Sequence, residues 1–101
     1  MGAGCIRLGG AQFAGLHGQK ARNIQTATSL VRQAAAQGAQ VVMTPEVALT
    51  GFTGGSAERA VAEPIPGPAT EVFSALAREL DVYILLGLSE LRDGELYNAM
   101  A

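Results

Sequence analysis

The sequence predicts an α/β fold with the element order β-α-β-α-β-β in one small domain. Two short runs rich in aliphatic and β-branched residues, at 40–43 and 82–91, are typical of strands that are covered on both faces. Apolar residues recur at helical spacing over residues 24–37 and 68–80. The 101 residues suffice for a single hydrophobic core and are too few for two.

The first strand is expected over residues 5–13, where Gly9 and Gly10 indicate a bulge or the close approach of another backbone. Asn23 is expected to cap the first helix, and Gly38 to end it in the left-handed conformation. With the strand that follows, this segment forms a strand–helix–strand unit. Such units favour parallel pairing through a right-handed crossover.

The later part of the chain is expected to form a short helical turn, a second long helix and a hairpin. Ser56 is a candidate cap for the short turn, and Pro68 suits the first turn of the long helix. A third strand is expected over residues 82–91. Asp93 and Gly94 form a strong two-residue turn signal, so the residues after them are expected to return as an antiparallel strand.

Composition and charge exclude several classes of function. The formal net charge is -2 and the isoelectric point is near 5.2, so no attraction to nucleic acid or to an anionic membrane is expected. Aromatic residues make up only 5%, which argues against a surface that stacks bases. No apolar run approaches the roughly 18 residues that span a bilayer, and the first residues lack the pattern of a secretory signal. We expect a cytoplasmic protein without nucleic-acid or membrane partners.

The single cysteine and the single histidine argue against redox and metal chemistry. Cys5 alone cannot form an internal disulfide, and together with His17 it cannot supply the ligands of a histidine and cysteine metal site. We expect Cys5 to be a small buried apolar residue and His17 to lie on the surface. No metal and no cofactor are expected.

The loop at residues 44–55 is the candidate functional segment. It follows a buried strand, presents Glu46, and ends in a glycine-rich stretch that fits neither common phosphate-binding motif. Open α/β sheets bind their ligands beyond the carboxyl ends of the strands. On composition alone, Glu46 is either a solvated loop carboxylate or a general base. The second interpretation is favoured if Val47, Leu49 and Phe52 shield the carboxylate from water.

Residues 45–52, Pro-Glu-Val-Ala-Leu-Thr-Gly-Phe, resemble the Pro-Glu-x-x-Leu-Thr-Gly-Tyr motif of the nitrilase superfamily of carbon–nitrogen hydrolases. Further matches follow in the family's order over nearly the whole chain. They are Gln12, Asn23, Gly38 and Ala39, residues 65–68 and 77–80, Gly87, Glu90 and residues 96–98. Each match is weak alone, and the ordered set favours a catalytic role for Glu46.

The resemblance implies the first part of a four-layer αββα sandwich and a Glu–Lys–Cys mechanism without a cofactor. In that mechanism a cysteine thiolate attacks an amide, N-carbamoyl or nitrile carbon, and water hydrolyses the resulting acyl-enzyme. Glu46 would be the general base, and the lysine would stabilise the developing charge. Phe52 stands where the family usually has tyrosine and would form a wall of the substrate pocket. The family commonly assembles into homo-oligomers, dimers or larger.

The chain departs from the family pattern in one respect. The family's lysine and cysteine follow the strand that begins near Tyr97, and this sequence ends at Ala101. Lys20 and Cys5 do not lie at the positions of those two residues. We therefore expect residues 1–101 to be the amino-terminal part of a single carbon–nitrogen hydrolase domain, incomplete at its carboxyl terminus. Such a chain would be inactive alone, and its reading frame would continue.

Two alternatives from other classes remain open. A non-catalytic, truncated subunit would act by association, because exposed strand edges favour pairing with another chain. A small flavodoxin-like binding module would hold an anionic ligand at the loop after the second strand. The charge of Glu46 argues against that module, since it would repel the ligand.

Overall fold

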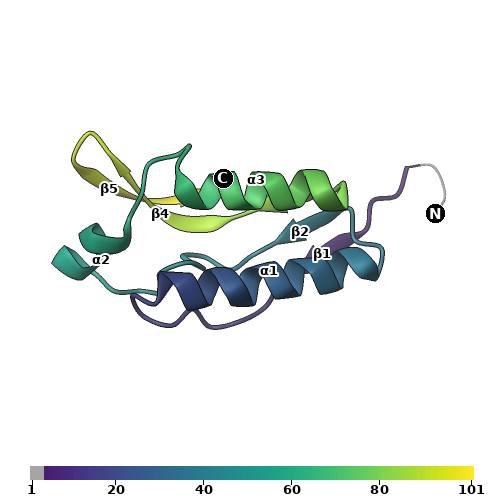
Figure 1. Ribbon diagram of the computed structural model, residues 1–101, viewed down its shortest axis with the longest axis horizontal. Coiled ribbons are helices and arrows are strands. Elements are labelled where there is room, and N and C mark those ends of the chain that lie inside the picture. Colours follow the sequence, from purple (N-terminus) through teal and green to yellow (C-terminus); the bar gives the residue numbers. More distant parts are fainter. Residues whose placement is uncertain (1–3) are drawn as a thin grey trace.

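Three short parallel strands form the central sheet, in the order β1-β2-β3 (Figure 1). They are β1 (Leu8–Gly10), β2 (Val41–Met43) and β3 (Tyr83–Leu85). The register sets Leu8 beside Val41, and Val41 beside Tyr83. The computed structural model describes residues 4–101. The predicted parallel pairing of the first two strands across a helix is confirmed.

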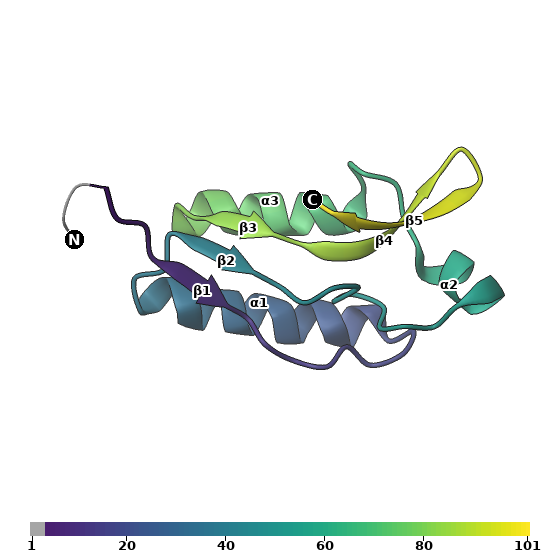
Figure 2. The same cartoon turned by 180° about the vertical axis from the view of Figure 1, so that it is seen from behind.

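Two long helices, α1 (Lys20–Ala36) and α3 (Pro68–Leu80), lie side by side on one face of the sheet (Figure 2). Gly9 faces α1 without room for a side chain, because a Cβ there would lie 3.0 Å from the Cβ atoms of Ala34 and Ala39. The predicted close approach therefore occurs at Gly9, although side chains make it rather than a backbone. The core between helices and strands is almost entirely aliphatic: Ala27, Val31, Val42, Leu49, Phe73, Leu76, Leu86 and Leu88.

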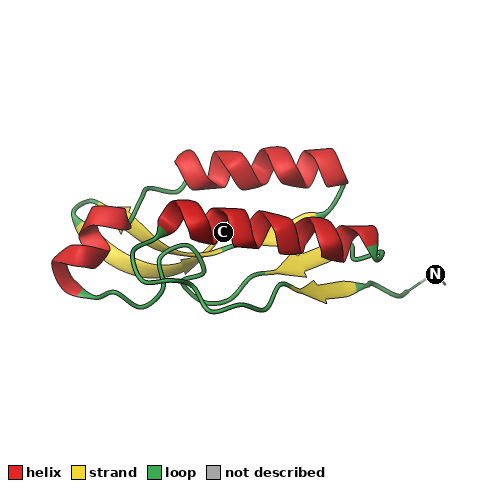
Figure 3. Cartoon of the chain, turned by 60° about the horizontal axis from the view of Figure 1, so that its bottom comes forward, coloured by secondary structure: helices red, strands yellow, loops and turns green. Residues whose placement is uncertain are grey.

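The opposite face of the central sheet carries exposed apolar side chains. Leu8 is 74% exposed, Met43 50% and Tyr83 77%. Side chains alternate along a strand, so these residues point away from the side that the helices cover. Figure 3 shows the two long helices and the strands as separate layers. Within residues 4–101 the sheet therefore has one covered face and one apolar face open to solvent.

The remaining two strands, β4 (Gly87–Arg92) and β5 (Glu95–Met100), form the predicted antiparallel hairpin. Asp93 and Gly94 form its turn, with φ values of 51° and 78°. The prediction of one continuous strand over residues 82–91 was wrong, because β3 and β4 belong to different sheets.

The β2–β3 ladder ends at Thr44, which is where that predicted strand divides. Thr44 donates its backbone N–H to the Leu85 carbonyl at 2.9 Å, but its hydroxyl, and not its carbonyl, accepts the next N–H, that of Gly87, at 3.0 Å. The chain after Leu85 therefore has no partner in the parallel sheet. Leu86 instead exchanges two backbone hydrogen bonds with Ala101, each of 2.9 Å.

Three local predictions have different outcomes. β1 is shorter than the predicted 5–13, because β2, with which it pairs over three residues, is equally short. Ser56 is not a helix cap, since α2 (Gly55–Val61) begins after Gly54. Gly38 follows the last turn of α1 with a φ of 95°, as predicted.

None of the helices within residues 4–101 has both the length and the apolar character needed to cross a bilayer.

The prediction that Asn23 caps α1 was wrong. α1 begins at Lys20, so Asn23 lies inside the first turn, and it is only 1% exposed. Its Oδ1 accepts a hydrogen bond from the N–H of Leu16, and its Nδ2 donates to the carbonyl of Leu16, both at 2.8 Å. Nδ2 also donates to the carbonyl of Leu49 at 2.8 Å. The residue therefore joins the loop before α1 to the loop after β2.

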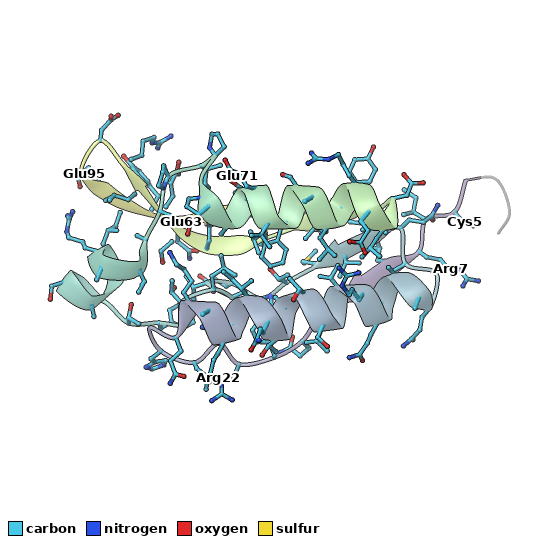
Figure 4. The ribbon with its side chains drawn as sticks, viewed as in Figure 1. Cys5, Arg7, Arg22, Glu63, Glu71 and Glu95 are labelled. Atoms are coloured by element: carbon cyan, nitrogen blue, oxygen red, sulfur yellow. The ribbon has the colours of Figure 1, made fainter. Side chains whose placement is uncertain are left out.

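A partly buried ion pair ties the beginnings of α1 and α3 together. Glu63, in the connection between α2 and α3 (Figure 4), is 5% exposed, and its Oε2 lies 2.7 Å from the Lys20 ammonium. Its Oε1 accepts the backbone N–H of Ala69 in the first turn of α3 at 2.5 Å. Lys20 also donates to the Val61 carbonyl at 3.0 Å. Both carboxylate oxygens have partners, which is the condition under which a buried charge is tolerated.

A second ion pair lies on the exposed sides of the two long helices. Arg32 of α1 donates to both carboxylate oxygens of Glu79 in α3. The hydrogen bond from Arg32 holds the pKa of Glu79 below its usual value. The two side chains are 52% and 56% exposed, so solvent screening leaves this pair little influence on stability.

Gly87 begins β4 where the loop after β2 crosses it. A Cβ at Gly87 would lie 2.1 Å from the carbonyl oxygen of Pro45, which is rigid backbone. We expect Gly87→Ala to lower the free energy of unfolding by about 3 kcal/mol, the upper part of the range for overpacking. Urea unfolding measures this loss. Gly10→Ala is the matched control, since no heavy atom lies within 4 Å of its Cβ position. Equal stability of the two variants would contradict the assigned contact.

Asn23→Ala removes three hydrogen bonds at once and leaves buried backbone groups without partners. We expect a loss of about 2–3 kcal/mol in the free energy of unfolding. The amide of Leu16 should also exchange its hydrogen faster, because Asn23 is the acceptor of that N–H. Hydrogen exchange followed by NMR measures this effect. Gln25→Ala, at an exposed position of the same helix, is the control and should leave the Leu16 amide unchanged.

Candidate active site

The loop after β2 is fixed at its first residue by the junction of β3 and β4. The hydroxyl of Thr44 donates to the Leu85 carbonyl at 3.1 Å and accepts the backbone N–H of Gly87 at 3.0 Å. The side chain of Thr44 thus bonds to the chain on both sides of Leu86. This arrangement places the next residues beyond the carboxyl ends of the parallel strands, where open α/β sheets bind ligands.

A tight turn directly after Glu46 sets the direction of its side chain. Val47 has a φ of 44°, a left-handed conformation that is strained for a β-branched residue. Its carbonyl accepts the N–H groups of Thr50 at 3.2 Å and Gly51 at 2.8 Å, which closes the turn. Val47 and Leu49 are 4% and 0% exposed.

The predicted apolar shield around Glu46 is not formed within residues 4–101. Val47 and Leu49 are turned into the protein interior by the tight turn, and Leu49 belongs to the main core. Glu46 itself is exposed, and Phe52 is 67% exposed. The expectation that Val47, Leu49 and Phe52 exclude water from the carboxylate was therefore wrong for this part of the chain.

One side chain from a distant part of the chain contacts the carboxylate. The Nδ2 of Asn98, in β5, donates a hydrogen bond to Oε1 of Glu46, across 52 residues of sequence. Asn98 is part of the ordered set of residues on which the family resemblance depends, but no role was predicted for its side chain. Only the hairpin, which brings β5 next to the loop, creates this contact.

Glu46 and Phe52 line the same cavity, which has a volume of about 320 Å³. Its walls come from the loops after β1 and β2. They consist of Phe13, Ala14, Gly15, His17, Pro45, Glu46, Val47, Gly51 and Phe52. The two loops touch through their backbones, because a Cβ on Gly51 would lie 2.8 Å from the carbonyl oxygen of Gly15. The size suits a small molecule.

The other candidate residues lie in different surroundings. Cys5 precedes the amino end of β1, whereas Glu46 follows the carboxyl end of the parallel strand β2, so the two are at opposite ends of the sheet. Cys5 is exposed, so the prediction that it is buried was wrong. Figure 4 shows that Cys5 also lies far from Glu63, the buried carboxylate. His17 is exposed, as predicted, and lies at the cavity.

Lys20 has a structural role, because its ammonium makes contacts that join parts of the fold. Its ammonium binds Glu63 and the Val61 carbonyl, so it is held between α1 and the connection to α3. The part of the cavity that residues 4–101 form contains a carboxylate and an imidazole, and neither a lysine nor a cysteine. A hydrogen-bonded carboxylate in such a cavity can accept a proton from a nucleophile or from water.

Comparisons with known proteins give the family. The model of the carbon–nitrogen hydrolase family matches residues 7–101. An (R)-stereoselective amidase from Pseudomonas sp. is 32% identical over 88 residues, which are 87% of this chain and 32% of that protein. Omega-amidase NIT2 from Danio rerio is 40% identical over 80 residues, or 78% of this chain and 28% of that protein. The chain thus spans about a third of the length of these relatives.

A solved structure shows the same fold. Nit3 of Saccharomyces cerevisiae, a member of branch 10 of the nitrilase superfamily, matches with a TM-score of 0.74 at 21% identity. The match covers 94% of this chain and 38% of that chain. The α/β chain described above is therefore a part of the nitrilase fold, and the protein belongs to the carbon–nitrogen hydrolase family.

Proposed function

We propose that this chain carries the general base of an enzyme that hydrolyses a non-peptide carbon–nitrogen bond, and that the base is Glu46. The observation that supports this most directly is the position of its carboxylate. It lies beyond the carboxyl end of β2, lines a cavity of about 320 Å³, and is held there by Asn98. The family and the amidase relatives support amides as the substrate class, with N-carbamoyl compounds and nitriles as further candidates.

The proposed reaction is a Glu–Lys–Cys mechanism. Glu46 takes the proton of a cysteine thiol, and the thiolate attacks the carbonyl carbon of the amide. A lysine stabilises the negative charge that develops on the oxygen. The amine or ammonia leaves with the proton from Glu46, and a thioester remains. Glu46 then accepts a proton from water, which attacks the thioester. The C–S bond breaks, the acid is released, and Glu46 returns the proton to the cysteine sulfur.

We further propose that the catalytic lysine and cysteine lie in a part of the polypeptide that follows residue 101. Residues 1–101 would then be inactive by themselves. Two observations support this. The chain spans about a third of the amidase relatives. One face of its sheet exposes Leu8, Met43 and Tyr83, which is the face that a second sheet covers in an αββα sandwich.

The same exposed face supports a second candidate function, that of a non-catalytic subunit. Exposed apolar side chains on a sheet face favour association with another chain. In this alternative, residues 1–101 would function by binding a partner or a second copy of the same chain. The complete enzyme would also be a homo-oligomer on the first proposal. Hydrolysis by the longer protein therefore separates the two candidates, whereas self-association does not.

The decisive experiment on the first proposal is Glu46→Gln in the protein encoded by the continued reading frame. We expect the release of ammonia from amides to fall by about 10²–10⁴-fold, the contribution of a general base. Glu71→Gln, an equal change of charge at an exposed position of α3 (Figure 4), should leave turnover unchanged. Circular dichroism should be the same for both variants. Turnover by Glu46→Gln at the parent rate would remove Glu46 from the mechanism.

Phe52 is proposed to form a wall of the substrate pocket. Phe52→Ala in the longer protein should raise KM by about 3- to 10-fold and change kcat little, because the ring would contact substrate and transition state alike. Steady-state kinetics on the best amide substrate measure both constants. Val72→Ala, at another exposed apolar position, on α3 and outside the cavity, is the control. A drop in kcat without a change in KM would argue against the wall.

A further inference from the structure

We propose that Asn98 is a positioning residue for Glu46, holding Oε1 of the carboxylate so that Oε2 faces the reacting groups. This inference rests on the proposed function of Glu46 as the base. The contact is one hydrogen bond, from Nδ2 of Asn98 to Oε1 of Glu46. Within residues 4–101, Oε2 has no hydrogen-bond partner. One oxygen is thus anchored and the other is free to accept a proton.

The chemistry of the two groups determines the direction of this hydrogen bond. An ionised carboxylate can only accept, so the amide of Asn98 must present its Nδ2 and not its oxygen. The bond to Nδ2 therefore fixes Oε1 and leaves Oε2 as the oxygen that can accept a proton. When Glu46 accepts a proton at Oε2, the carboxyl becomes neutral and the bond to Oε1 weakens.

Glu46 needs such an anchor because its immediate neighbours do not hold it. Its side chain is exposed, and Val47 and Leu49 point into the protein interior. A free glutamate side chain samples many rotamers, and fixing it has an entropic cost. Catalysis requires the accepting oxygen to stay within hydrogen-bond reach of the proton it removes. Asn98 supplies the constraint that packing does not.

Asn98 can act in this way because its own strand is fixed against the loop after β2. In the hairpin register, Asn98 lies opposite Ser89. Cross-strand partners point to the same face of a hairpin. The Ser89 hydroxyl lies 3.4 Å from the hydroxyl of Thr50, and both residues are 1% exposed. One cross-strand pair therefore contacts the loop at two places, at Glu46 and at Thr50.

The test is a pair of variants in the longer protein, Asn98→Leu and Asn98→Asp. The substrate is whichever of a set of aliphatic amides and N-carbamoyl amino acids the parent protein hydrolyses fastest. We expect Asn98→Leu to lower kcat/KM by about 10- to 100-fold, the range for a lost hydrogen bond to a charged group. The loss should fall on kcat and leave KM nearly unchanged, because the proposed anchor orients the base and does not contact the substrate. Asn98→Asp should lower kcat at least as far, because a carboxylate has no N–H to donate to Oε1 of Glu46.

The split between kcat and KM distinguishes positioning from a merely structural role. A damaged hairpin would raise KM as well as lower kcat, and that outcome would overturn the proposal. Glu95→Gln, at the hairpin end of β5 (Figure 4), controls for a change elsewhere on the strand and should keep both kcat and KM.

Failure of this proposal and failure of the proposed function have different signatures. Unchanged kcat and KM in Asn98→Leu, together with an inactive Glu46→Gln, would overturn the role of Asn98 and leave Glu46 as the base. An active Glu46→Gln would instead remove the basis of both proposals.

Discussion

The crossing of the loop after β2 over the first residue of β4 is the constraint on which the rest of the structure depends. The β2–β3 ladder ends at Thr44, and Gly87 lets the Pro45 carbonyl pass at a distance that no side chain would allow. The Thr44 hydroxyl binds the chain on both sides of this crossing. Because β3 loses its partner there, the chain is free to form the β4–β5 hairpin. The hairpin then brings Asn98 to Glu46.

Polar residues of low exposure stabilise the loops around the crossing rather than the sheet itself. Asn23 joins the loop before α1 to the Leu49 carbonyl, and Glu63 joins Lys20 to the first turn of α3. Each of these side chains satisfies two or three partners at once, so removing it leaves several groups unpaired. Asn23 thereby links the two loops whose residues line the cavity at Glu46. A functional side chain needs such support from its surroundings to keep a productive geometry.

Sequence patterns predicted the elements well because each pattern reflects a local cause. Helical spacing of apolar residues predicted α1 and α3, and the Asp93-Gly94 turn predicted the hairpin. The same patterns could not show that Asn23 is buried, since its partners lie 7 and 26 residues away. They also could not show where the strand at 82–91 divides, because the ladder ends at Thr44, in the loop after another strand. Glu46 was found from the family motif, and its contact with Asn98 required the topology.

The exposure of Glu46 has a consequence for the origin of its reactivity. A carboxylate in contact with water is a weak base, and burial is the usual way in which enzymes strengthen it. Leu49 cannot provide that burial, since it belongs to the main core, and Val47, which lines the cavity, leaves Glu46 exposed. Any desolvation must therefore come from groups outside residues 4–101 or from the substrate itself. In an active enzyme, this segment would fix the geometry of the base, and the arrival of further layers or of substrate would set its strength.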